Sequence, residues 1–256
     1  MATRTAFTTH FQQSVTPNAL RSYLAEFIST FIFVLAAAGS AVSSRKLMPD
    51  ARSDPASLVA VAVANAFGLA SAVYISASVS GGHVNPAVTF AKVVGCHIPI
   101  PTALFYWISQ MLGSVMACLI LKVVTVNQAV VAHAIAPEMT GFGASILEAV
   151  LTFGLVFTVY TARDPRHGQL VSTGPLAIGL MAGANVLAAG PFSGGSMNPA
   201  YSFGAAAISG SFKNQAVYWV GPLIGAAVAG LLYDNVVYPP LDSDASRCGG
   251  QDGPRV

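Results

Sequence analysis

The chain has 256 residues, of which 54% are hydrophobic and only 9% are charged, with a formal net charge of +2 at pH 7. Soluble domains carry about 25% charged residues, so this composition excludes an ordinary soluble protein and indicates a membrane protein. The small net charge also excludes the strongly basic surface by which proteins bind nucleic acid.

The first half of the chain contains three apolar stretches that are long enough to cross a bilayer, which takes about 20 helical residues. They are predicted at 20–42, 58–79 and 102–124, after a polar N-terminal tail at 1–19. A shorter apolar segment begins at Pro86, between the second and third stretches, and fades near Gly95. At 1.5 Å per residue its roughly ten residues reach about 15 Å, which is half of the ~30 Å hydrocarbon core.

The second half repeats this order. Its spans are predicted at 141–162, 170–189 and 216–237, with a second short helix beginning at Pro199 and a polar C-terminal tail at 239–256. Because each half has an odd number of spans, the second is inverted relative to the first, and the two short helices meet by their N-termini at mid-membrane. The predicted fold is an all-α membrane domain at 20–238, with six transmembrane helices and two half-helices in an inverted repeat (20–124 and 141–238). Arg4 and Arg21 before the first span, with Arg163 and Arg166 after the fourth, favour a cytoplasmic N-terminus. The basic residues of the loop after the first span argue the other way, and they are Arg45, Lys46 and Arg52.

One motif is written twice and precedes each half-helix. The first copy, at 80–90, is Ser-Gly-Gly-His-Val-Asn-Pro-Ala-Val-Thr-Phe, and the second, at 193–203, is Ser-Gly-Gly-Ser-Met-Asn-Pro-Ala-Tyr-Ser-Phe. Asn85 and Asn198 are suited to cap the helices with their side-chain oxygens while their amide nitrogens donate to a passing water. The two helix N-termini add partial positive charge, which opposes protons and cations. The motif therefore predicts a water-conducting site at the bilayer midplane.

The paired motifs Asn85-Pro86-Ala87 and Asn198-Pro199-Ala200, on this inverted repeat, resemble the aquaporins, or major intrinsic proteins. The runs at 26–30, 80–90 and 158–161 are similar to the plant tonoplast intrinsic subfamily, and the filter residues are most similar to its fifth group. The resemblance implies a passive channel for water and small neutral solutes that excludes protons and ions and needs no cofactor. It also implies a homotetramer, located in the plant vacuolar membrane, with other internal membranes as the alternative.

The resemblance places a selectivity ring near the outer mouth. Its four members would be Asn65, Val186, Gly195 and Tyr201, and Tyr201 stands where most relatives have an arginine. A ring without that cation should be wider and less charged, and should admit urea, glycerol, ammonia or hydrogen peroxide as well as water. The resemblance also places His133 over the outer mouth, although a loop histidine is commonly a solvated surface group.

Two carboxylates lie inside predicted spans. Glu26 and Glu148 occupy matching positions in the two halves, and an ionisable group in a span suggests a functional site by default. As proton relays they would suit the rival function, a proton-coupled secondary transporter of a small polar solute. As structural groups they would accept hydrogen bonds from backbone N–H groups of the loops before the half-helices, and their symmetry favours this role. His83 is expected to support the first of these loops.

The sequence offers no support for an enzyme, because it contains no nucleophile–base pair, phosphate-binding loop or metal-ligand cluster. Its three cysteines, Cys96, Cys118 and Cys248, show neither paired nor zinc-ligand spacing. We therefore expect no metal and no disulfide.

Overall fold

The computed structural model describes residues 10–48, 54–126, 128–166 and 172–239, and the regular elements in these ranges are helical. Five helical stretches in these ranges are long and apolar enough to cross a membrane, the fifth being Val217–Val237, and a sixth, Gly174–Ala189, is apolar but only 16 residues long. The elements in chain order are α2 (Pro17–Leu47), α3 (Pro55–Ser76), α4 (Pro86–Val94), α5 (Ile100–Val124), α6 (Gly141–Ala162), α7 (Gly174–Ala189), α8 (Pro199–Ser209), α9 (Val217–Leu232) and the π-helical turn η3 (Tyr233–Val237). The all-helical fold with two half-helices, α4 and α8, is confirmed.

Local capping explains where several helices begin. The side chain of Thr16 accepts from Ala19 N and Pro17 follows it, so α2 begins three residues before its predicted start. Asp54 caps α3 in the same way, ahead of Pro55. At its other end α3 stops at Ser76, earlier than the predicted 79, because the chain turns there toward the first copy of the motif. The limits of α6 coincide with the predicted span.

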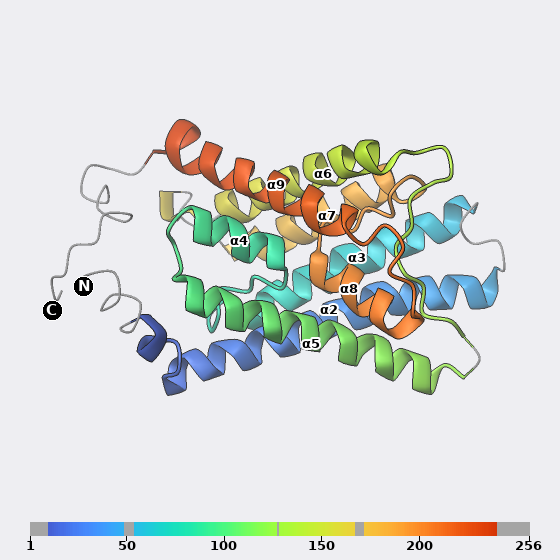
Figure 1. Ribbon diagram of the computed structural model, residues 1–256, viewed down its shortest axis with the longest axis horizontal. Helices are drawn as coiled ribbons and strands as arrows, with labels where there is room; N and C mark the ends of the chain where they lie inside the picture. The colour runs from blue at the N-terminus through green and yellow to red at the C-terminus, as the bar shows by residue number, and fades with distance from the viewer. Residues whose placement is uncertain (1–9, 49–53, 127, 167–171, 240–256) are drawn as a thin grey trace, which may run out of the picture.

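The helices pack in pairs that respect the repeat. In the first half α2 packs on α5, and in the second half the equivalent helix α6 packs on α9, while α3 and α7 contact each other across the two halves. Each half-helix packs against the last span of the opposite half, α8 on α5 and α4 on α9. Figure 1 shows α4 toward the end of the bundle at which α2 begins and α8 toward the opposite end. We call the surfaces at these two ends of the bundle, the one toward α4 and the one toward α8, the inner mouth and the outer mouth.

Small residues allow the paired helices to come close. A methyl group at Gly113 of α5 would clash with the backbone of Phe27 in α2, and one at Gly225 of α9 would clash with the backbone of Ala149 in α6. Gly179 of α7 meets the backbone of Ala66 in α3 equally closely. Such contacts let bundles pack tightly where lipid removes the hydrophobic drive between helices.

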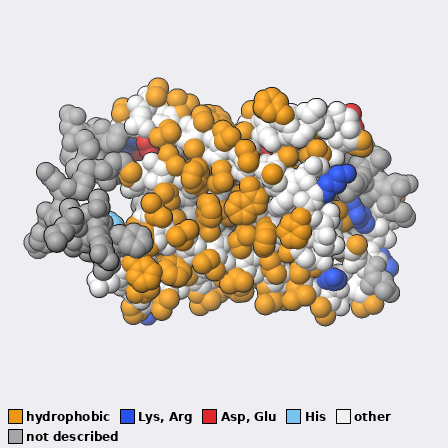
Figure 2. Space-filling model, viewed as in Figure 1, with side chains coloured by type: hydrophobic (Ala, Val, Ile, Leu, Met, Phe, Trp, Pro, Cys, Tyr) orange, Lys and Arg blue, Asp and Glu red, His pale blue; other side chains and the backbone are white. Residues whose placement is uncertain are grey.

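The flank of the bundle is apolar. Figure 2 shows hydrophobic side chains along its length, with Lys and Arg side chains gathered near the outer end. Exposed residues such as Phe67 and Val150 belong to long helices and would face lipid. The chain is therefore a multi-pass integral membrane protein.

The expectation of no disulfide is wrong for one cysteine. Cys96 is disulfide-bonded, whereas Cys118 is buried and free, and Cys248 lies outside the described residues. Spacing along the chain does not reveal which cysteines the fold brings together. Most of the predicted tails, 1–19 and 239–256, also falls outside the described ranges, but Ser14 is buried and its carbonyl accepts from the Tyr23 hydroxyl at 2.6 Å.

Candidate functional site

The two loops that precede the half-helices have the same unusual backbone. In the first loop Gly81, Gly82 and Val84 have φ values of 85°, 58° and 58°. The equivalent residues of the second loop, Gly194, Gly195 and Met197, have φ values of 90°, 61° and 53°. A β-branched valine rarely adopts positive φ, so the surrounding contacts must hold the loop in this shape. The duplicated sequence thus encodes a duplicated conformation.

Asn85 and Asn198 cap the half-helices as the motif predicts. The side-chain oxygen of Asn85 accepts from Ala87 N at 2.8 Å, and that of Asn198 accepts from Ala200 N at 3.0 Å. Pro86 and Pro199 occupy the first helical position, where a missing N–H costs nothing.

The two asparagines also tie the half-helices together. Asn85 Nδ2 donates to Met197 O at 2.9 Å, and Asn198 Nδ2 donates to Val84 O at 2.9 Å. Each side-chain amide carries two N–H groups, so one hydrogen is used in this exchange and the second remains for another acceptor. This geometry holds both amides beside each other at the point where the helix N-termini meet.

Glu26 is fully buried and binds the first loop from behind. Its Oε1 accepts from Ser80 Oγ at 2.6 Å and from His83 N at 2.8 Å, and its Oε2 accepts from Val84 N at 2.7 Å and from Gln110 Nε2 at 2.7 Å. Four donors therefore surround one carboxylate, which satisfies its charge inside the bundle.

Glu148 holds the second loop in the same manner. It accepts from Ser193 Oγ at 2.7 Å, from Ser196 N at 3.0 Å and from Met197 N at 2.8 Å. These contacts are the ones that a loop-supporting carboxylate requires. His83 lies in the first loop, where its Nδ1 is 3.0 Å from Thr89 Oγ1.

Three of the four predicted ring residues line one cavity of about 580 Å³ at the outer mouth, namely Asn65, Val186 and Tyr201. The fourth, Gly195, packs beside them, because a methyl group added there would lie 3.2 Å from the Cα of Val186. The Tyr201 ring is 7% exposed and makes an edge contact with Phe33 at 5.7 Å between ring centroids. The structure therefore brings the four residues together.

His133 lines the same cavity and contacts Tyr201. Their ring centroids are 4.5 Å apart, and His133 Nδ1 lies 3.3 Å from Ser202 Oγ. A methyl group at Gly194 would lie 2.8 Å from Cδ2 of His133. Burial lowers the pKa of His133 to about 4, so its imidazole is neutral near neutral pH. The alternative of a freely solvated loop histidine does not fit these contacts.

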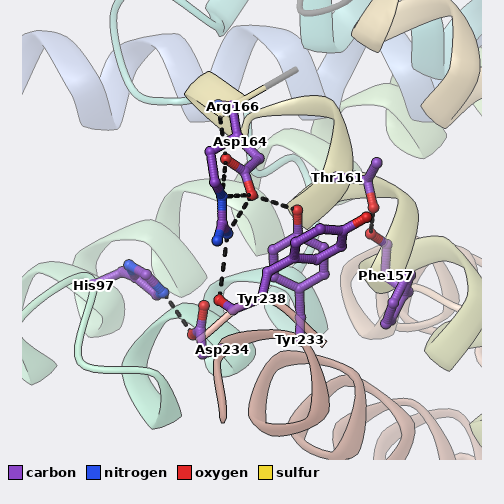
Figure 3. A network of polar contacts seen from close by, with 8 residues as sticks. All are labelled: His97, Phe157, Thr161, Asp164, Arg166, Tyr233, Asp234 and Tyr238. Atoms are coloured by element: carbon purple, nitrogen blue, oxygen red, sulfur yellow. Dashed lines mark hydrogen bonds and ion pairs between the residues drawn. The ribbon is translucent and has the colours of Figure 1, made fainter. Parts of the chain in front are cut away.

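At the inner end, a polar network joins the loop after α6 to the end of α9 (Figure 3). Asp164 pairs with Arg166 and accepts from the Tyr233 hydroxyl at 2.7 Å, and His97 Nε2 lies 2.7 Å from Asp234 Oδ2. The hydrogen bonds from Arg166 hold the pKa of Asp164 well below its ordinary value, so this carboxylate stays charged. The network fixes the backbone at the inner mouth.

Two kinds of supporting residue escaped the sequence analysis. Gln110, fully buried on α5, bridges Glu26 and Thr89 Oγ1, the latter at 3.0 Å. The hydroxyls of Tyr106 and Tyr218 donate to the carbonyls of Ser80 and Ser193, the first residue of each motif copy. A lone glutamine in the uncharged stretch 93–121 was the available signal for Gln110, because an amide in a membrane span needs partners. Among the described residues, no group of three or more His, Cys, Asp or Glu side chains is arranged to hold a metal ion.

Comparison with known proteins gives concordant results. The family model described as major intrinsic protein matches residues 13–233. A protein named probable aquaporin TIP5-1 from Arabidopsis thaliana is 62% identical over 249 residues, covering 97% of each chain. The rice protein of the same name is 55% identical, covering 92% of this chain and 91% of that one. Aquaporin TIP2-1 from Arabidopsis thaliana is also 55% identical, with coverage of 88% and 91%.

The fold has a solved counterpart as well. The X-ray structure of the aquaglyceroporin from Plasmodium falciparum superimposes with a TM-score of 0.75, covering 86% of this chain and 97% of that chain. Only 19% of the residues are identical, so this likeness concerns the fold alone.

Proposed function

The chain belongs to the major intrinsic protein family, the aquaporins, and from this membership we propose that its pore conducts urea, glycerol, ammonia or hydrogen peroxide in addition to water. Members of the family are channels and not enzymes, so the chain passes water and small solutes passively. Its relatives belong to the tonoplast intrinsic subfamily, and within that subfamily the chain resembles the fifth group. We place it accordingly in the vacuolar membrane, as a homotetramer.

The observation that carries the proposed function, a channel that passes water and excludes protons, is the pair of asparagines at the junction of the half-helices. Asn85 and Asn198 each retain one side-chain N–H after capping and cross-bonding. A water that accepts from both would turn its oxygen toward them and could not also accept from its neighbour. The hydrogen-bonded file that carries protons would be broken there, while water itself passes.

The ring residues support the wider solute range. Tyr201 contributes no fixed charge and packs against Phe33 and His133, while Gly195 leaves the backbone uncovered beside Val186. A neutral solute larger than water meets apolar surface there instead of a guanidinium. His133 adds a fifth residue to this mouth, so its position as well as the ring composition sets the width.

The contacts of the buried carboxylates argue against the transporter. Glu26 and Glu148 each accept hydrogen bonds from two backbone N–H groups and one serine hydroxyl of a loop, which is the arrangement expected of a loop support. We therefore assign both carboxylates, with His83, to loop support.

Stopped-flow permeability of proteoliposomes to a panel of water, urea, glycerol, ammonia and hydrogen peroxide tests the proposal. We expect water and at least one larger solute to cross faster than through protein-free vesicles. Val186→Trp, which fills the ring, should reduce both fluxes together. Water flux without any solute flux would contradict the wider range, and solute flux that survives Val186→Trp would contradict the shared route.

A further inference from the structure

The loop after α6 contains a charged side chain that the pore described so far does not use. Arg163 is the C-cap residue of α6 and is half-buried. Its Nη2 donates to Gly82 O at 2.9 Å, and its Nη1 would lie 3.2 Å from a methyl group at Gly81. A guanidinium therefore lies against the two glycines of the first loop.

The side of the loop on which Arg163 lies follows from peptide geometry. The carbonyl of Gly82 and the N–H of His83 belong to the same peptide unit, and no peptide bond in the described residues is cis. In a trans peptide these two groups point in opposite directions. Glu26 accepts from the N–H at 2.8 Å and Arg163 donates to the carbonyl, so the two side chains lie on opposite sides of the loop. Since Glu26 lies within the bundle, Arg163 lies on the side of the loop that faces away from that core.

The outer mouth shows the same arrangement with a different residue. Gly194 is the counterpart of Gly81 in the duplicated motif, and the His133 ring lies against it as Arg163 lies against Gly81. His133 lines the outer cavity. By the symmetry of the repeat, Arg163 occupies the equivalent place at the inner mouth.

We propose that Arg163 lines the inner mouth and supplies there the fixed positive charge that the outer ring lacks, which makes this mouth a barrier to cations. This inference rests on the proposed channel function. A charge beside a narrow, low-dielectric passage is weakly screened, so one guanidinium can repel cations without blocking a neutral solute.

The surroundings of Arg163 are consistent with a charge held in place. Asp164, next in the chain, is buried and anchored by Arg166 and by the Tyr233 hydroxyl, which fixes the turn that carries Arg163 (Figure 3). Other ionisable groups in its electrostatic surroundings are Glu26, His83 and Tyr106. Four hydrogen-bond donors stabilise the Glu26 carboxylate. Lys92, on α4, lies over the Tyr160 ring, with its Nζ 3.5 Å from the ring centroid.

Charge substitution tests the proposal. Arg163→Gln keeps a donor for Gly82 O but removes the charge, and we expect cation conductance in planar bilayers to rise about ten-fold in a protein that still conducts water. Arg163→Lys should stay tight to cations. Arg21→Gln, which removes an exposed charge at the same end of the bundle, is the matched control and should also stay tight.

A second variant covers the case in which Arg163→Gln does not assemble. Arg163→His carries a charge that can be titrated in one folded protein, so cation conductance should rise between about pH 5 and pH 8 as the imidazole loses its proton. The wild type, measured over the same steps, controls for the other histidines. An Arg163→Gln channel that conducts water and excludes cations would overturn the proposal. An Arg163→His channel that conducts water and shows no pH-dependent rise in cation conductance would overturn it as well. Failure of the channel function itself would appear earlier, as a wild type that passes no water.

Discussion

Asn85 and Asn198 each donate a side-chain hydrogen bond to the backbone carbonyl immediately before the other asparagine, both at 2.9 Å. The two half-helices are therefore coupled through the residues to which we assign the pore-facing role. Replacing one asparagine with a residue that lacks the amide removes a contact of the opposite loop together with the donor proposed to face the pore.

Replacing either asparagine by aspartate should admit cations. Asn198→Asp puts a negative charge where the two helix N-termini present positive potential, and it loses the donor to Val84 O. We expect cation conductance in planar bilayers to rise. Asn198→Ala loses the same hydrogen bond without adding a charge and serves as the control. If Asn198→Asp passes water but no more cations than Asn198→Ala, the electrostatic part of the barrier is wrong.

The structure sharpens the prediction for Glu26. Both of its oxygens accept from two donors, so Glu26→Gln must turn an NH₂ group toward a backbone N–H that then loses its partner. We expect a loss of stability of about 1–3 kcal/mol, and a larger loss for Glu26→Leu, which leaves all the donors unpaired. Thermal unfolding in detergent measures this, with the exposed Glu138→Gln as control. A fully stable Glu26→Gln protein that has lost a pH-dependent flux would favour the proton relay instead.

Restoring a cation at the outer ring should narrow the solute range. Tyr201→Arg places a guanidinium beside Val186 and Asn65, which constricts the cavity and recruits water. The ratio of urea or glycerol permeability to water permeability, taken in the same vesicles, should fall. Tyr201→Phe keeps the aromatic contacts with Phe33 and His133 and should leave that ratio unchanged. An unchanged or higher ratio in Tyr201→Arg would mean that Tyr201 does not line the constriction.

His133 should make the protein less stable in acid. Burial lowers its pKa to about 4, whereas an unfolded histidine titrates near 6.5. The folded form thus binds its proton less readily, so this contribution to stability is complete above about pH 6.5 and is lost as the pH falls toward 4. We expect the Tm to drop between about pH 6.5 and pH 4, and to drop less in His133→Phe. Equal acid-side losses in both proteins would show that His133 does not titrate as inferred.

The sequence was sufficient for the order of the helices and for the caps of the two half-helices, because both occur twice and follow from helix length and capping. Asn85 and Asn198 could be assigned to caps from their neighbours alone. The cross-bonds to Met197 and Val84 could not, because they depend on how two distant loops face each other. The contacts of Gln110 and the orientation of Arg163 are likewise products of packing between segments far apart in the chain. The disulfide of Cys96 was missed for the same reason.

We propose that water passes through this protein while protons do not, and one preparation can test both statements. Proteoliposomes that contain a pH-sensitive dye are given an osmotic step and, separately, a proton gradient with urea present on both sides. We expect a water permeability about ten-fold above that of protein-free vesicles, a proton flux no faster than the lipid leak, and no urea accumulation. Proton entry through the protein, or urea driven against its own gradient by protons, would contradict it.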